Sequence, residues 1–294
     1  MRWDRACAAM AALAASACII IPSDGDASDG GAAPPGDGGG GAAVDAGADE
    51  GDGTCDPAPG STTGKKIRVV YLVPSDRQED PRYTASLEQS LRTVQLWLRA
   101  RTPQGTSFRV HDPAVEVVKS EHPEAYYNSN DTGRPDLLYW DNTLADAFAA
   151  TGADFDDPDN VWLIYVDVAA GCGQRTGTAG HVALFPRNDL LGLVAEPRVK
   201  VCPDDPDESY GRCRWVGGMA LLMMNALGVP APAACTDEDE ATKCPDDNIS
   251  RRGYLSFPQA GLEPEQLSYL DGTGFANAIG LPDCELDCNA VPEP

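Results

Sequence analysis

The sequence contains little positive charge and little histidine. Its 294 residues include 22 lysines and arginines against 46 aspartates and glutamates, which gives a formal net charge of −24. This deficit of basic residues argues against nucleic acid and anionic lipid surfaces as partners, because both are bound through basic patches. We interpret the acidity as favouring solubility rather than calcium binding, since the acidic stretches lack the spaced pattern and the glycine of a calcium loop.

Several catalytic signatures are also missing. No C-x-x-C pair occurs, which disfavours a zinc ribbon, and no G-x-S-x-G nucleophile motif occurs. The glycine-rich stretch 171–180 lacks the G-K-[ST] ending of a phosphate loop and the strand–helix context of a dinucleotide fingerprint. We therefore interpret residues 171–180 as a surface loop. No pair of carboxylates has a spacing that would indicate a glycosidase.

The first 64 residues have the composition of an export signal followed by a tether. Arg2 and Arg5 precede a short apolar run that ends in A-S-A-C at Cys18. This pattern predicts a lipoprotein-type signal peptide over residues 1–18, with ordinary signal cleavage as the alternative. The apolar run is too short for a membrane span. Residues 19–64 are rich in Gly, Ala, Asp and Pro, which predicts a disordered acidic linker.

These features predict an exported protein. The protein would reach the membrane only through a lipid anchor at Cys18. The signal that retains lipoproteins in the inner membrane usually has an aspartate directly after the lipidated cysteine, and Ile19 stands there instead. This favours the outer membrane or cell surface of a Gram-negative bacterium. Periplasmic or secreted protein is the alternative. Eight cysteines after Cys18 fit this compartment, because an even count in an exported chain predicts up to four disulfides. Sequence proximity suggests the pairs Cys202–Cys213, Cys235–Cys244 and Cys284–Cys288.

Residues 65–294 are long enough for one domain with a sizeable core and a cysteine-containing C-terminal tail. Apolar, β-branched runs indicate strands, and apolar residues at helical spacing indicate amphipathic helices. The segment 181–185 is short, and we expect it at a sheet edge. We predict strands over residues 67–74, 108–119 (with a kink at Asp112-Pro113), 160–168 and 181–185, and helices over residues 83–101, 135–151 and 214–227.

The predicted helix over residues 214–227 is the element around which we expect the rest of the domain to pack. It is apolar almost all round, so we expect it to be buried. Gly228 supplies a left-handed C-cap, and Pro230 prevents the helix from continuing. From these residues alone, the segment is a core helix.

Its surroundings resemble a known motif. G-G-x-x, five further residues and A-L-G-x-P-x-P are similar to the frame of the zincin metallopeptidase motif H-E-x-x-H-x-x-G-x-x-H. Aligned on Gly228, which is retained, Leu221 and Asn225 occupy the first two ligand positions and Ala231 the third, while Leu222 occupies the general-base position. Catalytic zinc needs three lone-pair donors, an open position for water and a carboxylate. The resemblance therefore implies a zinc site that has been lost, with no metal cofactor.

Further blocks resemble the same group of exported zinc metallopeptidases. They are V-V-Y-L-V-P-S-D-R at residues 69–77, D-D-P-D-N-V-W-L-I-Y-V-D at residues 156–167, C-R-W-V-G-G at residues 213–218 and the segment after Asp246. The last segment corresponds to a turn that carries a methionine beneath the metal, and Ser250 stands at that position. The resemblance implies an α+β zincin-like fold, in which a twisted mixed sheet packs on two long helices and disulfides fasten the loops.

The same resemblance implies a substrate groove. The central helix would lie beneath it, and the strand at residues 181–185 would form its upper rim, where active relatives pair with extended substrate. His181 is the one histidine beside this groove, because His111 and His122 fall in exposed loop or strand-end positions. The candidate groove residues are His181, Val182, Ala183, Leu184, Phe185, Leu221 and Asn225.

Our leading hypothesis is a catalytically inactive metallopeptidase homologue that binds an extended peptide or protein segment in the relict groove. One alternative is an active zinc metalloendopeptidase with ligands recruited elsewhere, for example His181 with acidic side chains. The other is a structural envelope lipoprotein whose groove is closed. Fold resemblance by itself does not establish activity.

Overall fold

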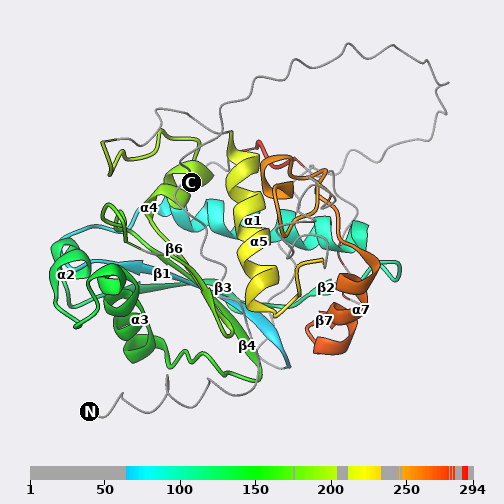
Figure 1. Ribbon diagram of the computed structural model, residues 1–294, viewed down its shortest axis with the longest axis horizontal. Coiled ribbons are helices and arrows are strands. Elements are labelled where there is room, and N and C mark those ends of the chain that lie inside the picture. Colours follow the sequence, from blue (N-terminus) through cyan, green and yellow to red (C-terminus); the bar gives the residue numbers. More distant parts are fainter. Residues whose placement is uncertain are drawn as a thin grey trace, which may run out of the picture.

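A five-stranded sheet with the strand order β3-β1-β4-β6-β5 forms the centre of the computed structural model (Figure 1). The structure describes residues 64–174, 176–203, 211–232, 245, 247–277, 279, 281 and 287–290. The predicted signal peptide with Cys18, and all but the last residue of the predicted linker, lie outside these residues. Four strands are parallel and the fifth is antiparallel: β1 (Lys66–Val73), β3 (Val110–Lys119), β4 (Asn160–Val166), β6 (Val182–Phe185) and the antiparallel β5 (Gly177–Ala179).

Strand β4 shows why the sheet is buried on both faces. Its odd-numbered residues, such as Leu163 and Tyr165, join the cluster with the central helix. Its even-numbered residues, such as Trp162 and Ile164, join a second cluster on the opposite face. A strand in which both alternating sets are apolar has to be covered on both sides. The predicted buried strands over residues 67–74 and 160–168 are confirmed as β1 and β4.

Helices therefore cover both faces of the sheet (Figure 1). On one face pack α1 (Pro81–Arg101), α4 (Arg187–Leu193) and α5 (Arg212–Ala226). On the other pack α2 (Glu124–Ser129) and α3 (Leu138–Thr151). The mixed sheet with two long helices on one face is as predicted, but the α+β class is wrong. Strands that alternate with helices on both faces of a mostly parallel sheet make an α/β arrangement.

The remaining elements are short. The predicted strand over residues 108–119 is divided into β2 and β3, and β2 pairs instead with a strand near the C-terminus. The predicted helix over residues 135–151 begins with a 3₁₀ turn before α3. These short elements are β2 (Ser107–Phe108), the 3₁₀ segments Pro135–Leu137 and Gly253–Leu255, α7 (Pro264–Thr273) and β7 (Ala276–Asn277).

The prediction that residues 181–185 form an edge strand is wrong. Strand β6 lies between β4 and β5, and Val182, Ala183, Leu184 and Phe185 have no exposed surface. The edge is β5, which falls within the stretch that we interpreted as a plain loop. Its Gly-Thr-Ala sequence carries little strand signal, because glycine and alanine are depleted in strands.

Among the described residues, two disulfides fasten the loops, and neither follows sequence proximity. Cys172 pairs with Cys202 across 30 residues, and Cys213 pairs with Cys288 across 75 residues. The predicted pairs Cys202–Cys213 and Cys284–Cys288 are therefore wrong, and Cys235–Cys244 lies outside the described residues. Disulfides are typical of an oxidising, extracytoplasmic compartment. Within the described part of the chain, every helix is too short or too polar to cross a membrane.

The packing of α4 on α5 depends on a glycine. A Cβ on Gly192 would stand 2.2 Å from three atoms of the Trp215 indole. We therefore expect Gly192→Ala to lower the free energy of unfolding by about 1–3 kcal/mol, as measured by urea denaturation. Gly272 in α7 is the matched control, since a Cβ there meets nothing within 4 Å. Gly272→Ala is expected to stabilise by up to about 1 kcal/mol. Equal stability of the two variants would contradict this packing.

Candidate functional site

Helix α5 places two of the four positions that the sequence aligns with the zincin motif in the hydrophobic core. Leu221 and Leu222 are 5% and 7% exposed and belong to the main core cluster. The predicted C-cap is confirmed, because Gly228 has φ +76° and its N–H donates to Asn225 O at 2.9 Å. At the first ligand position and the general-base position, the chain therefore presents packed aliphatic side chains.

The other two motif positions are partly exposed, and they do not fit zinc either. The side chain of Ala231 is a methyl group and has no lone pair to give to a metal. Asn225 carries a neutral amide whose Nδ2 is buried and meets no acceptor among the described residues. Leu221, Asn225 and Ala231 together supply none of the three strong donors that a catalytic zinc needs. Across the described ranges, no group of three or more His, Cys, Asp or Glu side chains is placed to share a metal ion.

A hydrogen-bonded network surrounds Ser250, the position that the sequence aligns with the methionine of the zincin turn. Ser250 Oγ accepts from Gln266 Nε2 at 2.8 Å, and the same amide donates to Pro230 O at 3.0 Å. Gln266 Oε1 in turn accepts from Asn248 Nδ2 at 2.8 Å. Gln266 is fully buried, so it ties the turn at Ser250 to the chain just beyond α5. Sequence reasoning missed this residue, although Glu263 and Gln266 have the spacing of a capping box.

The structure separates the candidate groove residues into buried strand residues and the partly exposed His181. Val182 to Phe185 lie in the interior of the sheet, with both strand edges paired, so they form no free rim. His181 precedes them and is partly exposed. Its Nδ1 lies 2.5 Å from Asp157 O, and because a carbonyl only accepts, Nδ1 carries the proton. The available rim is β5, which also contacts α5. On the outer side of β5, no other strand of the described residues pairs with it.

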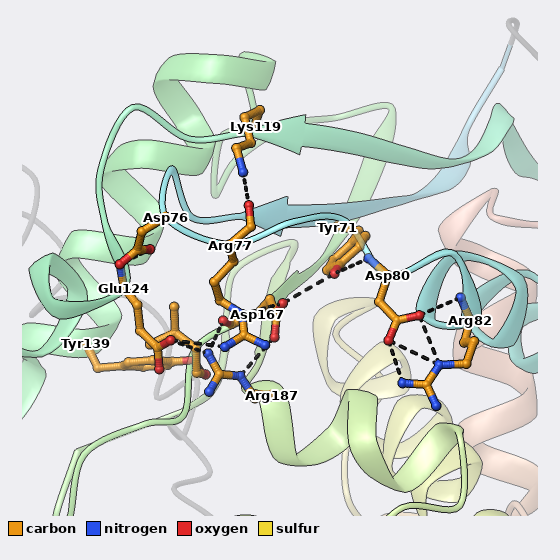
Figure 2. Close-up of polar contacts among 11 residues, drawn as sticks. Tyr71, Asp76, Arg77, Asp80, Arg82, Lys119, Glu124, Tyr139, Asp167 and Arg187 are labelled. Atoms are coloured by element: carbon orange, nitrogen blue, oxygen red, sulfur yellow. Dashed lines mark hydrogen bonds and ion pairs between the residues drawn. The ribbon is translucent and has the colours of Figure 1, made fainter.

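A second polar site lies at the carboxyl ends of the parallel strands (Figure 2). Asp167 follows β4 directly and its side chain is 1% exposed. Arg77 Nε donates to Asp167 Oδ2 at 2.7 Å, and Arg187 Nε donates to Oδ1 at 2.8 Å. Both guanidinium groups also reach Glu124 Oε2, at 3.2 Å and 2.7 Å. Two positive and two negative groups thus converge here, and we call Arg77, Glu124, Asp167 and Arg187 the carboxyl-edge cluster.

The position of this cluster is chemically significant. In open α/β sheets, ligands bind outside the carboxyl ends of the strands. They bind between two neighbouring strands whose following connections lead to opposite sides of the sheet. Here β1 leads to β3 on one side, whereas β4 leads to β6 on the other. Burial, followed by the charge of Asp167, raises the pKa of the Tyr71 hydroxyl beside the cluster. The sequence contained a signal for this site, since Arg77 follows the predicted buried strand over residues 67–74 and Asp167 is a charged residue near the end of the predicted buried strand over residues 160–168.

Asp189 is a perturbed carboxyl close to the cluster. A Cβ on Gly218 would stand 4.0 Å from Asp189 Oδ1 and 3.7 Å from Arg214 Nη1, so both charged side chains lie beside this glycine. Asp189 is partly exposed, but its carboxyl is enclosed, and burial raises its pKa to about 6 against the opposing attraction of Arg214. A carboxyl held in this way costs stability when it ionises.

Replacing Asp189 by asparagine is expected to stabilise the protein at neutral pH. The native carboxyl binds its proton more tightly than the unfolded one, whose pKa is 3.8. The free energy of unfolding therefore falls as the pH rises from about 4 to about 6. Asp189→Asn removes this loss, so we expect a gain of about 1–2 kcal/mol at neutral pH and none near pH 4. Chemical denaturation across this range tests it, with exposed Asp156→Asn as the control. A pH-independent difference would contradict it.

Comparison with known proteins gives a partial backbone likeness. No protein-family model matches the chain, and no curated protein matches it. Among solved structures, it is similar to catalytically inactive OgpA from Akkermansia muciniphila in complex with an O-glycopeptide substrate. That likeness has 18% sequence identity and a TM-score of 0.45. Wild-type OgpA gives 17% identity and a TM-score of 0.44. Each comparison covers 76% of this chain, which spans 65% of the length of the OgpA chains.

Proposed function

We propose that this protein is an exported, catalytically inactive homologue of zincin metallopeptidases that binds an extended peptide or protein segment along β5. One observation carries the proposal. The chain retains the helix and its Gly228 turn, yet Leu221, Leu222, Asn225 and Ala231 supply neither a zinc ligand set nor a proton acceptor. Loss at all four positions removes the metal, the activated water and the general base together.

Strand β5 is suited to binding by strand addition. A peptide that adds to a sheet edge gains main-chain hydrogen bonds from the outward N–H and C=O groups. Gly177, Thr178 and Ala179 carry none of the charges or prolines that blunt such edges in other sheets. Asn225 Nδ2 is a buried donor without an acceptor in the described structure, and a peptide carbonyl would satisfy it once the side chain turns toward the bound peptide. The short strand limits the number of main-chain bonds, so we expect modest affinity.

A peptide selected from a random library tests this function. We expect binding to protect the amides of Gly177, Thr178 and Ala179 from hydrogen exchange. N-methylation of alternate peptide amides should abolish binding, because it removes the donors that strand addition requires. Asn225→Leu is expected to weaken binding about tenfold, equivalent to one hydrogen bond. Asn289→Leu, at an exposed position outside α5 and β5, is the control. Binders that protect other segments and leave β5 unprotected would refute strand addition.

The burial of Leu221 and Leu222 favours a second candidate, a structural envelope protein in which the groove is closed. That candidate predicts that no library peptide protects β5. An active enzyme with recruited ligands would instead require tightly bound zinc. These outcomes separate the three functions, since each predicts a different combination of peptide binding and metal content.

Export with a lipid anchor is part of the proposal. The disulfides Cys172–Cys202 and Cys213–Cys288 support an oxidising compartment. Replacement of Cys18 by serine is expected to release the protein from the membrane fraction. Equal membrane association of the native and Cys18→Ser chains would contradict the anchor. One acyl chain alone gives weak membrane binding, so the multiply acylated terminus of a lipoprotein is required.

A further inference from the structure

The carboxyl-edge cluster has a buried side and an exposed side. The Asp167 side chain is 1% exposed and the Arg187 side chain 11%, whereas Arg77 is 34% and Glu124 is 35% exposed. Both arginines reach a single oxygen of Glu124, Oε2, while each oxygen of Asp167 accepts from a different arginine. Asp167 is therefore the fixed partner that orients both guanidinium groups. Glu124 lies on the other side of these groups from Asp167 (Figure 2), and its side chain is partly exposed to solvent.

We infer that Arg77 and Arg187 form an anion-binding site that Glu124 occupies from within the chain, and that the carboxylate or phosphate group of a ligand replaces Glu124 there. The inference does not depend on peptide binding at β5. It rests on the convergence of two arginines from different segments: Arg77 lies in the loop after β1, and Arg187 is the first residue of α4, which follows β6.

The charges of the cluster support this exchange. Asp167 neutralises one of the two guanidinium groups, so departure of the Glu124 carboxylate leaves a net charge of +1 beside two oriented donors. Guanidinium groups match the geometry of carboxylate and phosphate oxygens, with which they form short charge-assisted hydrogen bonds. Two further charges of opposite sign flank the cluster: Asp76 accepts from Glu124 N at 2.8 Å, and Lys119 Nζ donates to Arg77 O. More distant acidic residues are screened beyond about 8 Å at physiological ionic strength.

The structure also allows Glu124 to move aside. It stands in the first turn of α2, which is held by the buried Tyr127 and by the bond from Glu124 N to Asp76 Oδ1 at 2.8 Å. Neither contact uses the Glu124 carboxylate, so its side chain can rotate into solvent while the helix stays in place. An ion pair with a partner that is one-third exposed contributes little stability, typically about 0–1 kcal/mol. A ligand anion therefore competes against a weak internal bond.

Titration with inorganic phosphate and, separately, with acetate tests the inference on the full, disulfide-bonded chain. Glu124→Gln keeps the shape of the side chain and removes its charge. We expect this variant to bind at least one of the two anions about tenfold more tightly than the native chain. Glu121→Gln, an exposed change of the same charge in the same segment, should bind as the native chain does. Preference between the two anions identifies the chemical class of ligand.

A further variant separates this site from other basic groups. In the double variant Arg77→Gln with Glu124→Gln, the gain in affinity should be lost. Equal affinity of the native chain and Glu124→Gln, or retention of the gain in the double variant, would overturn the inference. If Glu124→Gln fails to fold, the Nε resonances of Arg77 and Arg187 in the native chain provide the test. Shifts on addition of either anion support the site, and unchanged resonances at saturating anion refute it.

Discussion

Leu222→Glu is expected to lower the free energy of unfolding by about 3 kcal/mol or more, which is a large part of the stability of an ordinary domain. The change places a glutamate at the position that aligns with the general base of the zincin motif. Leu222 is 7% exposed within the main core cluster. A carboxyl at this position loses its hydration and finds neither a metal nor a motif histidine, so it has to be buried neutral or force the core open. Urea denaturation with the disulfides intact measures the loss.

Leu255→Glu is the matched control for this change. Leu255 is 39% exposed in the 3₁₀ segment that packs near α5. The same substitution there should alter stability by no more than about 0.5 kcal/mol. If Leu222→Glu were tolerated as well as Leu255→Glu, a polar, hydrated cleft would have to lie above α5. The core assignment of this helix would then be wrong.

Asp167→Asn is expected to cost about 3–5 kcal/mol, because it removes the charge that two arginines share. Arg187 is 11% exposed at its side chain and would keep a largely buried positive charge with only Glu124 to balance it. The amide that replaces the carboxylate also turns N–H donors toward guanidinium donors. Thermal or urea unfolding of the native and variant chains measures this effect.

Glu196→Gln provides the control for the loss of an ion pair. Glu196 binds Arg82 at 2.6 Å, but both side chains are at least 40% exposed. Exposed pairs typically contribute about 0–1 kcal/mol and are weakened by salt. A loss in Asp167→Asn that is no larger than the loss in Glu196→Gln would show that the carboxyl-edge cluster does not hold the loops together.

The sequence predicted elements where one local pattern dominates. β1 and β4 are continuous apolar runs, and α5 has apolar residues on every side with Gly228 at its end, so composition alone determines burial. The sheet edge was predicted wrongly because β6 has an apolar sequence that suits either an edge or an interior strand. Its neighbour β5 is only three residues long. Which strand lies outermost depends on pairing between segments, and that is a tertiary property.

The two sites differ in how far the sequence revealed them. That Leu221, Asn225 and Ala231 make no zinc ligand set is readable directly from the sequence, because the donor atoms of a side chain depend only on the residue type. The carboxyl-edge cluster required the fold, since Arg77, Glu124, Asp167 and Arg187 come from four separate segments. The disulfides Cys172–Cys202 and Cys213–Cys288 were missed for the same reason, as each joins residues far apart in the chain.

The central claim is that this chain holds no catalytic zinc on α5. Elemental analysis of the untagged, oxidised and dialysed protein tests it most directly. We predict less than about 0.1 equivalent of zinc per chain, because a structural or catalytic site with a full ligand set would retain its metal through dialysis. About one tightly held equivalent of zinc per chain would contradict the account and show that ligands have been recruited elsewhere.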